Sequence, residues 1–242
     1  MLNIFSSTIY FIRWNSECDK MPHNSELYRT VKFRKLLENL TPSFQDYFHA
    51  EEAHILEHIL PESRVLEIGC GSGRVMTRMA HTAVEGLAAG VDYSTLQLED
   101  AVKNMNGSNN VEFYLQDGRN LGFKDDSFDI ACLTWNLLGS YNRKNQIALL
   151  GEAKRVVKPG GLVIASVFAE NALPFQVEQY DNWGFLYKGR GPDFVEICGP
   201  GLDIYSRRFR RHRLEKLCQD SGFEEYHIHK IAKFAYVIEA IK

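Results

Sequence analysis

The sequence predicts an α/β fold built on a doubly wound, mostly parallel sheet. From residue 61 onward, strand-like apolar runs alternate with runs whose apolar residues recur at three- and four-residue spacing, as in amphipathic helices. A repeated β-α-β-α order implies parallel strands with helices on both faces. The chain has 242 residues, 45% apolar and 24% charged, which is enough material for a sizeable core.

The alternation can be followed element by element. The expected helices are "RVMTRMAH" at 74–81, "STLQLEDAVKNM" at 94–105 and "NQIALLGEAKRVV" at 145–157. The strands expected around them are "RVLEIG" at 64–69, "LAAGVD" at 87–92, "VEFYLQ" at 111–116, "SFDIACLTW" at 127–135 and "GLVIASVF" at 161–168. Residues 61–168 are therefore predicted to form the core.

Segments at both ends of the chain are predicted to add to this core. Two amphipathic helices, with Ser25 and Ser43 as N-caps, predict a helical cap over residues 21–60. Residues 1–20 lack the features of a signal peptide and are expected to be a poorly ordered extension. Residues 169–206 are rich in Gly, Pro and aromatic residues, which predicts a small antiparallel lid insertion. Residues 207–242 are expected to add a helix and strands that complete the sheet.

Charge and cysteine usage limit the partners and the compartment. The formal net charge of -3 gives no general attraction to nucleic acid or to an anionic membrane. Five scattered cysteines without a C-x-x-C pair favour a reducing cytoplasm. The basic run "RRFRRHR" at 207–213 opens a predicted helix, which favours an ion-paired surface over contact with an anionic substrate or RNA. The sequence leaves a homo-oligomer open.

Three histidines on the second N-terminal helix, His49, His54 and His58, raise the question of a metal. The last two are four residues apart, but no supporting Cys or Asp and no H-E-x-x-H pattern accompanies them. We therefore expect no metal.

The stretch "VLEIGCGSGRV" at 65–75 places a glycine-rich turn after the first core strand, where open parallel sheets bind ligands. Gly69, Gly71 and Gly73 are spaced G-x-G-x-G, which disfavours the G-x-G-x-x-G turn of nicotinamide-binding folds. Acidic residues lie in or just after the first three strands: Glu67 inside the first, Asp92 at the end of the second, and Asp117 after the third. They suit a ligand with a cationic amine, a ribose and an adenine.

With these motifs in order, residues 51–166 resemble class I S-adenosylmethionine-dependent methyltransferases of the small-molecule type. "VLEIGCGSGRV" matches the first motif of that family, "GVDYS" the second, and "LQDGRNLGFKDDSFDIACL" the third and fourth together. The resemblance implies a Rossmann-like, seven-stranded sheet and the cofactor S-adenosyl-L-methionine, and it names no universal catalytic residue. The cofactor-binding residues that it implies are Glu67, Gly69, Cys70, Gly71, Gly73, Asp92, Tyr93, Asp117, Gly118 and Thr134.

The acceptor of the methyl group is expected to be a small molecule, with N- or O-methylation favoured. Trp135 and Asn136 follow the fourth core strand, and Trp183 and Arg190 belong to the insertion, so these four are the predicted substrate-binding residues. The alternatives are a methyltransferase acting on RNA or protein, a nicotinamide-dependent oxidoreductase, and a non-catalytic partner that keeps the fold.

Overall fold

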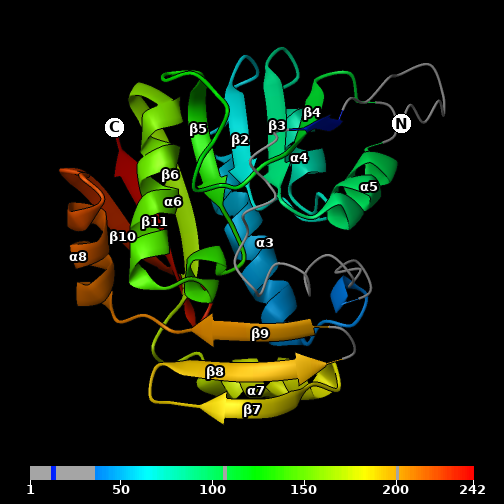
Figure 1. Cartoon of the computed structure of the whole chain (residues 1–242), viewed down its shortest axis with the longest axis vertical. Coiled ribbons are helices and arrows are strands. Elements are labelled where there is room, and N and C mark those ends of the chain that lie inside the picture. The colour runs from blue at the N-terminus through cyan, green and yellow to red at the C-terminus, as the bar shows by residue number, and fades with distance from the viewer. Residues whose placement is uncertain (1–11, 15–35, 106–107, 200–201) are drawn as a thin grey trace.

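The computed structural model describes residues 12–14, 36–105, 108–199 and 202–242. Its main sheet has eight strands in the order β1-β4-β3-β2-β5-β6-β11-β10 (Figure 1). Only β11 runs antiparallel to its neighbours among these described strands, and all other pairs are parallel. The strands are β1 (Ile12–Trp14), β2 (Arg64–Ile68), β3 (Leu87–Asp92), β4 (Val111–Leu115), β5 (Phe128–Leu133), β6 (Val157–Phe168), β10 (Glu225–Ile231) and β11 (Ala235–Ile241).

The predicted doubly wound, mostly parallel seven-stranded sheet is confirmed, and the short strand β1 extends it at one edge beside β4. The chain moves outward from β2 to β3 and β4, and then crosses back to β5 on the other side of β2. Strand order therefore reverses between β2 and β5, and in open α/β sheets the carboxyl ends of the strands at such a point form a ligand crevice.

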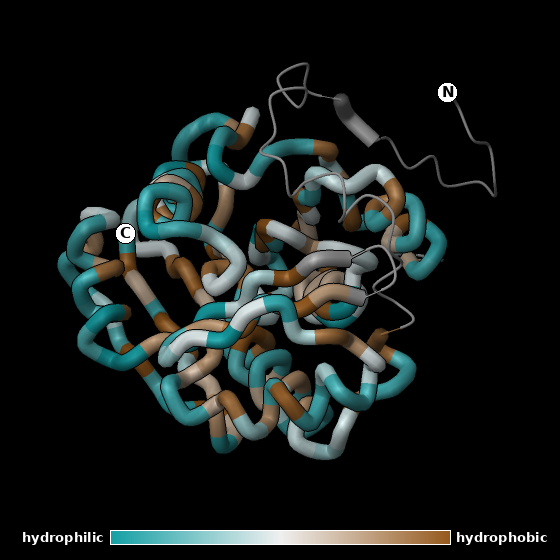
Figure 2. The backbone as a smooth tube through the Cα atoms, turned by 60° about the horizontal axis from the view of Figure 1, so that its bottom comes forward, coloured by the Kyte–Doolittle hydropathy of each residue, from teal (hydrophilic) through white to brown (hydrophobic). Residues whose placement is uncertain are grey.

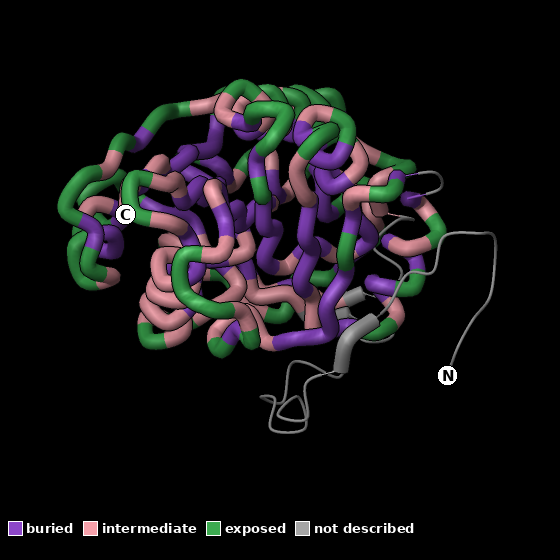
Figure 3. Tube along the Cα trace, turned by 90° about the horizontal axis from the view of Figure 1, so that it is seen from above, coloured by how far each residue is buried: buried purple, intermediate pink, exposed green. Residues whose placement is uncertain are grey.

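Helices cover both faces of this sheet (Figure 1). Alternate strand residues point to opposite faces, so Leu66 packs with the helices of one face and Val65 with those of the other. Figure 3 shows the buried strands between helices with exposed outer sides, and Figure 2 shows polar and apolar residues alternating along those helices. One face carries α6 (Arg143–Val156) and α8 (Arg211–Asp220), and the other carries α3 (Pro42–Leu56), α4 (Met76–Thr82) and α5 (Thr95–Asn104).

The insertion contains an antiparallel sheet, as predicted, here of three strands, and one helix that was not expected. Pro174 lies in the first turn of this helix, where a proline is tolerated. The insertion lies below the main sheet in Figure 1. Its elements are α7 (Leu173–Asn182), β7 (Leu186–Arg190), β8 (Phe194–Gly199) and β9 (Leu202–Arg207), with a short 3₁₀ helix, η2 (Leu137–Ser140), beside β9.

The arginines of the basic run at 207–213 bind residues of the insertion. Arg207 and Arg213 both pair with Asp193, each at 3.0 Å. Arg208 is buried, and it donates to the side chain of Gln176 at 2.9 Å and to backbone carbonyl oxygens of the β7–β8 turn. These arginines are therefore held by contacts within the chain.

At the N-terminal side, α3 begins at Pro42, so the expected N-cap Ser43 lies inside the first turn and Thr41 precedes the helix. Proline at the first helical position explains this start, since its φ suits a helix and its missing N–H needs no partner there. The expected extension at 1–20, apart from the three residues of β1, and most of the expected first helix lie outside the described residues. No helix in the described ranges is long and apolar enough to cross a membrane.

Candidate active site

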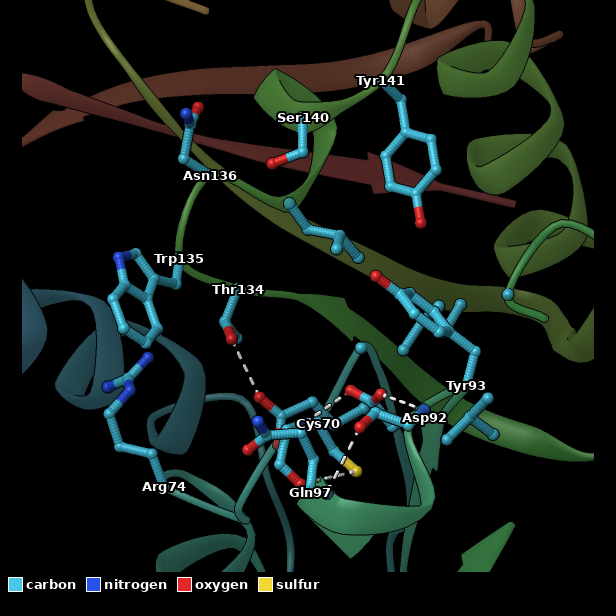
Figure 4. A pocket seen from close by; sticks show the side chains of 18 of the residues that line it. Cys70, Arg74, Asp92, Tyr93, Gln97, Thr134, Trp135, Asn136, Ser140 and Tyr141 are labelled. Atoms are coloured by element: carbon cyan, nitrogen blue, oxygen red, sulfur yellow. Dashed lines mark hydrogen bonds between the residues drawn. The ribbon is translucent and has the colours of Figure 1, made fainter. Parts of the chain in front are cut away.

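One cavity lies at the carboxyl ends of β2, β3 and β5, and strand β9 of the insertion forms its opposite wall. Figure 4 shows Arg74 and Trp135 at one end of it, and Tyr93 and Tyr141 at the other. The predicted residues that line it are Glu67, Gly69, Cys70, Gly71, Asp92, Tyr93, Gly118, Thr134, Trp135, Asn136 and Trp183. Gly73, Asp117 and Arg190 are not among the lining residues.

The glycine turn places backbone against this cavity. Gly69, Gly71 and Gly73 all have positive φ, at 76°, 53° and 81°, a region that favours glycine. A Cβ added to Gly71 would meet no atom within 4 Å, because the cavity lies there. A Cβ on Gly73 would instead come within 3.4 Å of Met105 and Ala101. The role of Gly73 is therefore to let α5 approach the turn, rather than to line the cavity.

Glu67 brings an incompletely paired carboxylate into the cavity. Its side chain is buried, and its Oε1 atom accepts a hydrogen bond from Thr134 Oγ1 at 2.8 Å. Its Oε2 atom is buried without a hydrogen-bond partner. Burial raises the pKa of Glu67 to about 8, although the charge of Arg74 and the bond from Thr134 act in the opposite direction. A buried acceptor in this condition suits a cationic donor from a ligand.

Arg74 and Glu51 form a buried ion pair beside Glu67, and neither was among the predicted site residues. Glu51, on α3, is fully buried and also accepts from the Tyr47 hydroxyl at 2.9 Å and from the backbone N–H of Trp135 at 2.8 Å. The Arg74 guanidinium lies 4.2 Å from the ring centre of Phe48 and lines the cavity. Helix α3 therefore positions both a cavity cation and the backbone of Trp135.

Asp92 closes the glycine turn onto the end of β3. Its Oδ2 accepts from Gly71 N at 2.9 Å, and its Oδ1 accepts from Ser94 N at 2.8 Å (Figure 4). Burial raises the pKa of Asp92 to about 6 in spite of these backbone hydrogen bonds. A carboxylate oxygen accepts two hydrogen bonds, so each one retains capacity for a hydroxyl of a ligand.

Asp117 does not line the cavity, and its carboxylate is paired locally. Asp117 Oδ1 accepts from the backbone N–H and the Nε of Arg119, both at 2.9 Å, and Oδ2 also contacts the guanidinium. Gln116 and Arg119 occupy the cavity wall on either side of it. Gly118 lines the cavity as predicted, and its lack of a side chain is required, since a Cβ there would come 2.4 Å from Ile68.

Aromatic side chains form the end of the cavity near Arg74. The ring centres of Trp135 and Trp183 are 6.1 Å apart, and Tyr180 lies 6.0 Å from Trp183. The Nε1 of Trp183 donates to the carbonyl oxygens of Leu36 and Asn39, both at 2.9 Å. The insertion therefore supplies part of this wall.

Asn136 and Arg190 do not present free polar groups to this end. The side chain of Asn136 is buried, accepts from Phe168 N at 3.0 Å and donates to Ser206 Oγ at 3.1 Å, so it connects β6 to β9. Arg190 is exposed on β7 and lies off the cavity wall. The substrate-binding prediction is therefore weakened for Asn136 and not supported by the position of Arg190.

Comparison with known proteins gives the same picture of the fold and the family. Residues 65–161 match the model of a methyltransferase domain family. A demethylmenaquinone methyltransferase of Desulfitobacterium hafniense is 33% identical over 161 residues, and one of Clavibacter sepedonicus is 29% identical over 143 residues. These alignments cover 64% and 59% of this chain, and 62% and 55% of the relatives, so the chain spans less than two thirds of their length.

Solved structures agree at the level of the fold. A structure of a methyltransferase from Methanosarcina mazei, described as S-adenosylmethionine-dependent, superimposes with a TM-score of 0.61 at 21% identity. The match covers 78% of this chain and 96% of that one. Residues 65–161 thus match a methyltransferase domain family, and the chain as a whole is similar in sequence and fold to methyltransferases that use S-adenosylmethionine.

Proposed function

We propose that this chain binds S-adenosyl-L-methionine in the cavity and transfers its methyl group to a small aromatic acceptor. The observation that carries the proposal is the unpaired, buried Oε2 of Glu67 beside the open space at Gly71. An ammonium group of the cofactor would complete the hydrogen bonding of Glu67. Arg74, which lines the same end of the cavity, would attract its carboxylate.

The rest of the cofactor would extend along the carboxyl ends of the strands. Asp92 would accept hydrogen bonds from the ribose hydroxyls, and Tyr93 would flank the ribose or the adenine. Gly118 and Gln116 line the cavity farther along and would contact the base. Asp117 would act here only through Arg119, which it holds in place.

The cofactor supplies a methyl group that is already activated by the positive sulfur. The chain then has to align the acceptor in line with the carbon–sulfur bond and exclude water. Trp135 and Trp183 suit both tasks, because flat apolar rings hold a planar acceptor and displace solvent. No side chain is assigned as a general base.

The class of acceptor follows from this wall and from the relatives. The two curated relatives described above are demethylmenaquinone methyltransferases, and a further relative is named a C-methyltransferase of ubiquinone and menaquinone biosynthesis. A conjugated ring is therefore the acceptor that we favour. The test incubates the protein with methyl-labelled cofactor and matched sets of quinols, phenols and aromatic amines. Methylation on carbon, oxygen or nitrogen of any aromatic member supports the proposal, and label only in RNA or protein contradicts it.

Removing the Asp92 carboxylate should weaken binding of S-adenosylhomocysteine by at least a hundredfold. Asp92→Ala removes the acceptor proposed for the ribose hydroxyls, and each hydrogen bond to a charged group contributes about 1.5 to 3 kcal/mol. It also releases the backbone N–H groups of Gly71 and Ser94. Calorimetric titration measures the dissociation constant. Asp126→Ala, a substitution in an exposed turn, is the control. An unchanged dissociation constant would exclude Asp92 from the site.

Shortening Trp183 should reduce turnover while cofactor affinity stays within a few-fold. Trp183→Ala removes an aromatic wall and the two hydrogen bonds that hold the segment before α3. Arg190→Ala serves as the matched control in the same insertion, since Arg190 lies off the wall. Steady-state kinetics on the aromatic acceptor separate the two. Equal turnover by both variants would mean that Trp183 does not contact the acceptor.

A further inference from the structure

A series of buried polar side chains in and next to the insertion leads to the cavity wall. It begins at Arg208, which is buried and whose Nη1 atom donates to Oε1 of Gln176 at 2.9 Å. Gln176, on α7, is buried as well, and its Nε2 atom donates to Oγ of Ser206 at 2.9 Å. Ser206, on β9, lines the cavity. One amide and one hydroxyl therefore connect a buried cation to the cavity.

Other contacts fix the orientation of both amide groups that meet Ser206. A guanidinium carries only donors, so the atom of Gln176 that faces Arg208 is the oxygen, and the NH₂ group faces Ser206. The side-chain oxygen of Asn136 accepts from the backbone N–H of Phe168 at 3.0 Å, so its NH₂ group also faces Ser206, at 3.1 Å. The Ser206 oxygen therefore accepts two hydrogen bonds, which is the full accepting capacity of a hydroxyl. It can interact further only as a donor.

The hydroxyl of Tyr180 receives the hydrogen bonds of this network at the cavity wall. Tyr180 is buried, lines the cavity and lies four residues after Gln176 on α7, so both side chains share one helix face. Its oxygen accepts a long hydrogen bond from Gln176 Nε2, at 3.5 Å, and it also hydrogen-bonds to Ser206. In the part of the chain that the structure describes, no carboxylate or carbonyl oxygen accepts the proton of Tyr180. That proton is available to a molecule in the cavity.

The protonation state of Tyr180 decides what this hydroxyl can do. Burial raises the pKa of Tyr180 above its ordinary value, although the hydrogen bonds from Ser206 and Gln176 act in the opposite direction. Tyr180 therefore keeps its proton at neutral pH. It is suited to donate a hydrogen bond to a ligand, and it is not suited to act as a base.

We infer that the Tyr180 hydroxyl donates a hydrogen bond to an oxygen atom of the methyl acceptor, and that this contact selects an oxygen-bearing aromatic ring over an aromatic amine or a hydrocarbon. The inference rests on the proposed function and narrows its class of acceptor. A phenol or quinol oxygen accepts such a bond, whereas the nitrogen of an aromatic amine shares its lone pair with the ring and accepts poorly. Trp183, whose ring centre lies 6.0 Å from that of Tyr180, would hold the acceptor ring next to this oxygen contact.

The selectivity follows from the cost of leaving a buried donor unpaired. A ring without an oxygen at this position would displace water from the Tyr180 hydroxyl and give it no new partner. Because α7 and β9 already hold Gln176, Ser206 and Tyr180 in place, the donor needs no rearrangement when an oxygen arrives. The positive charge of Arg208 at the far end of the network further favours a ligand atom that carries negative charge.

The test measures the binding of 2-naphthol, 2-naphthylamine and naphthalene to the full chain saturated with S-adenosylhomocysteine, by equilibrium dialysis. These three probes share one ring system and differ in one group. The wild type should bind 2-naphthol at least fivefold more tightly than either of the others. Tyr180→Phe keeps the aromatic ring and removes the hydroxyl, so its three dissociation constants should lie within about twofold of each other, with affinity for S-adenosylhomocysteine unchanged. Thermal unfolding checks that this variant is folded.

Tyr187→Phe is the matched control, because Tyr187 belongs to the same insertion, lies off the cavity wall and donates to Asp181 at 3.0 Å. It should keep the preference of the wild type. The inference is overturned if Tyr180→Phe also keeps that preference, or if the wild type binds the three probes equally or binds none of them. Dialysis without S-adenosylhomocysteine separates this inference from the proposed function. A preference for 2-naphthol that depends on Tyr180, in a chain that does not bind S-adenosylhomocysteine, would support the donor site and contradict the proposed function.

Discussion

Replacing Glu67 by Gln should stabilise the ligand-free protein and weaken S-adenosylhomocysteine binding at least a hundredfold. The carboxyl is buried with one oxygen unpaired, and burial raises its pKa to about 8 from an ordinary value of 4.5. The folded state therefore holds this proton more tightly than the unfolded state. Stability is lost as the pH rises from about 4.5 through 8, and glutamine, which stays neutral, avoids this loss.

The size of the effect follows from the pKa difference. Each pKa unit corresponds to about 1.4 kcal/mol. Above pH 8, the free energy of unfolding of the Glu67→Gln variant should therefore exceed that of the wild type by roughly 3 to 5 kcal/mol, and below pH 5 the two should differ little. Binding should change in the opposite direction, since a neutral amide cannot pair with the ligand ammonium. Thermal unfolding at pH 5 and pH 9, with titration of each variant, measures both.

Glu99→Gln is the matched control, because Glu99 is exposed on α5. It should change neither quantity. A Glu67→Gln protein that binds S-adenosylhomocysteine like the wild type would show that the unpaired oxygen does not receive the ligand ammonium.

Gly71→Val should abolish cofactor binding and leave the chain folded. Gly71 has a φ of 53°, which strains a branched side chain, and its Cβ position opens into the cavity rather than into packed atoms. The valine would therefore fill ligand space without displacing the core. We expect no S-adenosylhomocysteine binding at a hundred times the wild-type dissociation constant, measured by calorimetry, with the circular dichroism spectrum retained.

Gly160→Val separates backbone strain from loss of the ligand space. Gly160 has a φ of 77°, and a Cβ there also meets nothing within 4 Å, but it is an exposed residue near the start of β6, away from the cavity. Gly160→Val should lose about as much stability as Gly71→Val does, and it should bind S-adenosylhomocysteine as the wild type does. If Gly71→Val also bound normally, the turn would serve only the chain reversal.

The core of the fold was predictable because each buried strand and each amphipathic helix carries its own local pattern. The positions of the Gly69 to Gly73 turn and of Asp92 were predictable for a related reason, because both directly follow or end a strand, and strand ends lie at one edge of the sheet. Helix α7 was not predicted, because it lies in a segment rich in Gly, Pro and aromatic residues, and its own proline is accommodated in the first turn. The three residues of β1 are too few to show any periodicity.

The site was predictable where its residues belong to motifs at strand ends, and not where tertiary packing alone brings them together. Glu51 is 23 residues from Arg74 and 84 from Trp135, so only tertiary packing unites them. Arg74 directly follows the glycine turn, and this adjacency is the one signal that could have identified it. The pairing of Asp117 with Arg119, two residues away, could not be predicted, because spacing alone does not show which side chains form an ion pair.

The most direct test of cofactor binding in this cavity is a calorimetric titration of the wild-type chain with S-adenosylhomocysteine and, separately, with NADH. We expect one saturable S-adenosylhomocysteine site whose heat disappears in Gly71→Val, and no heat with NADH. Binding of NADH in the absence of any S-adenosylhomocysteine binding would contradict the assignment of the cavity to a methyl donor.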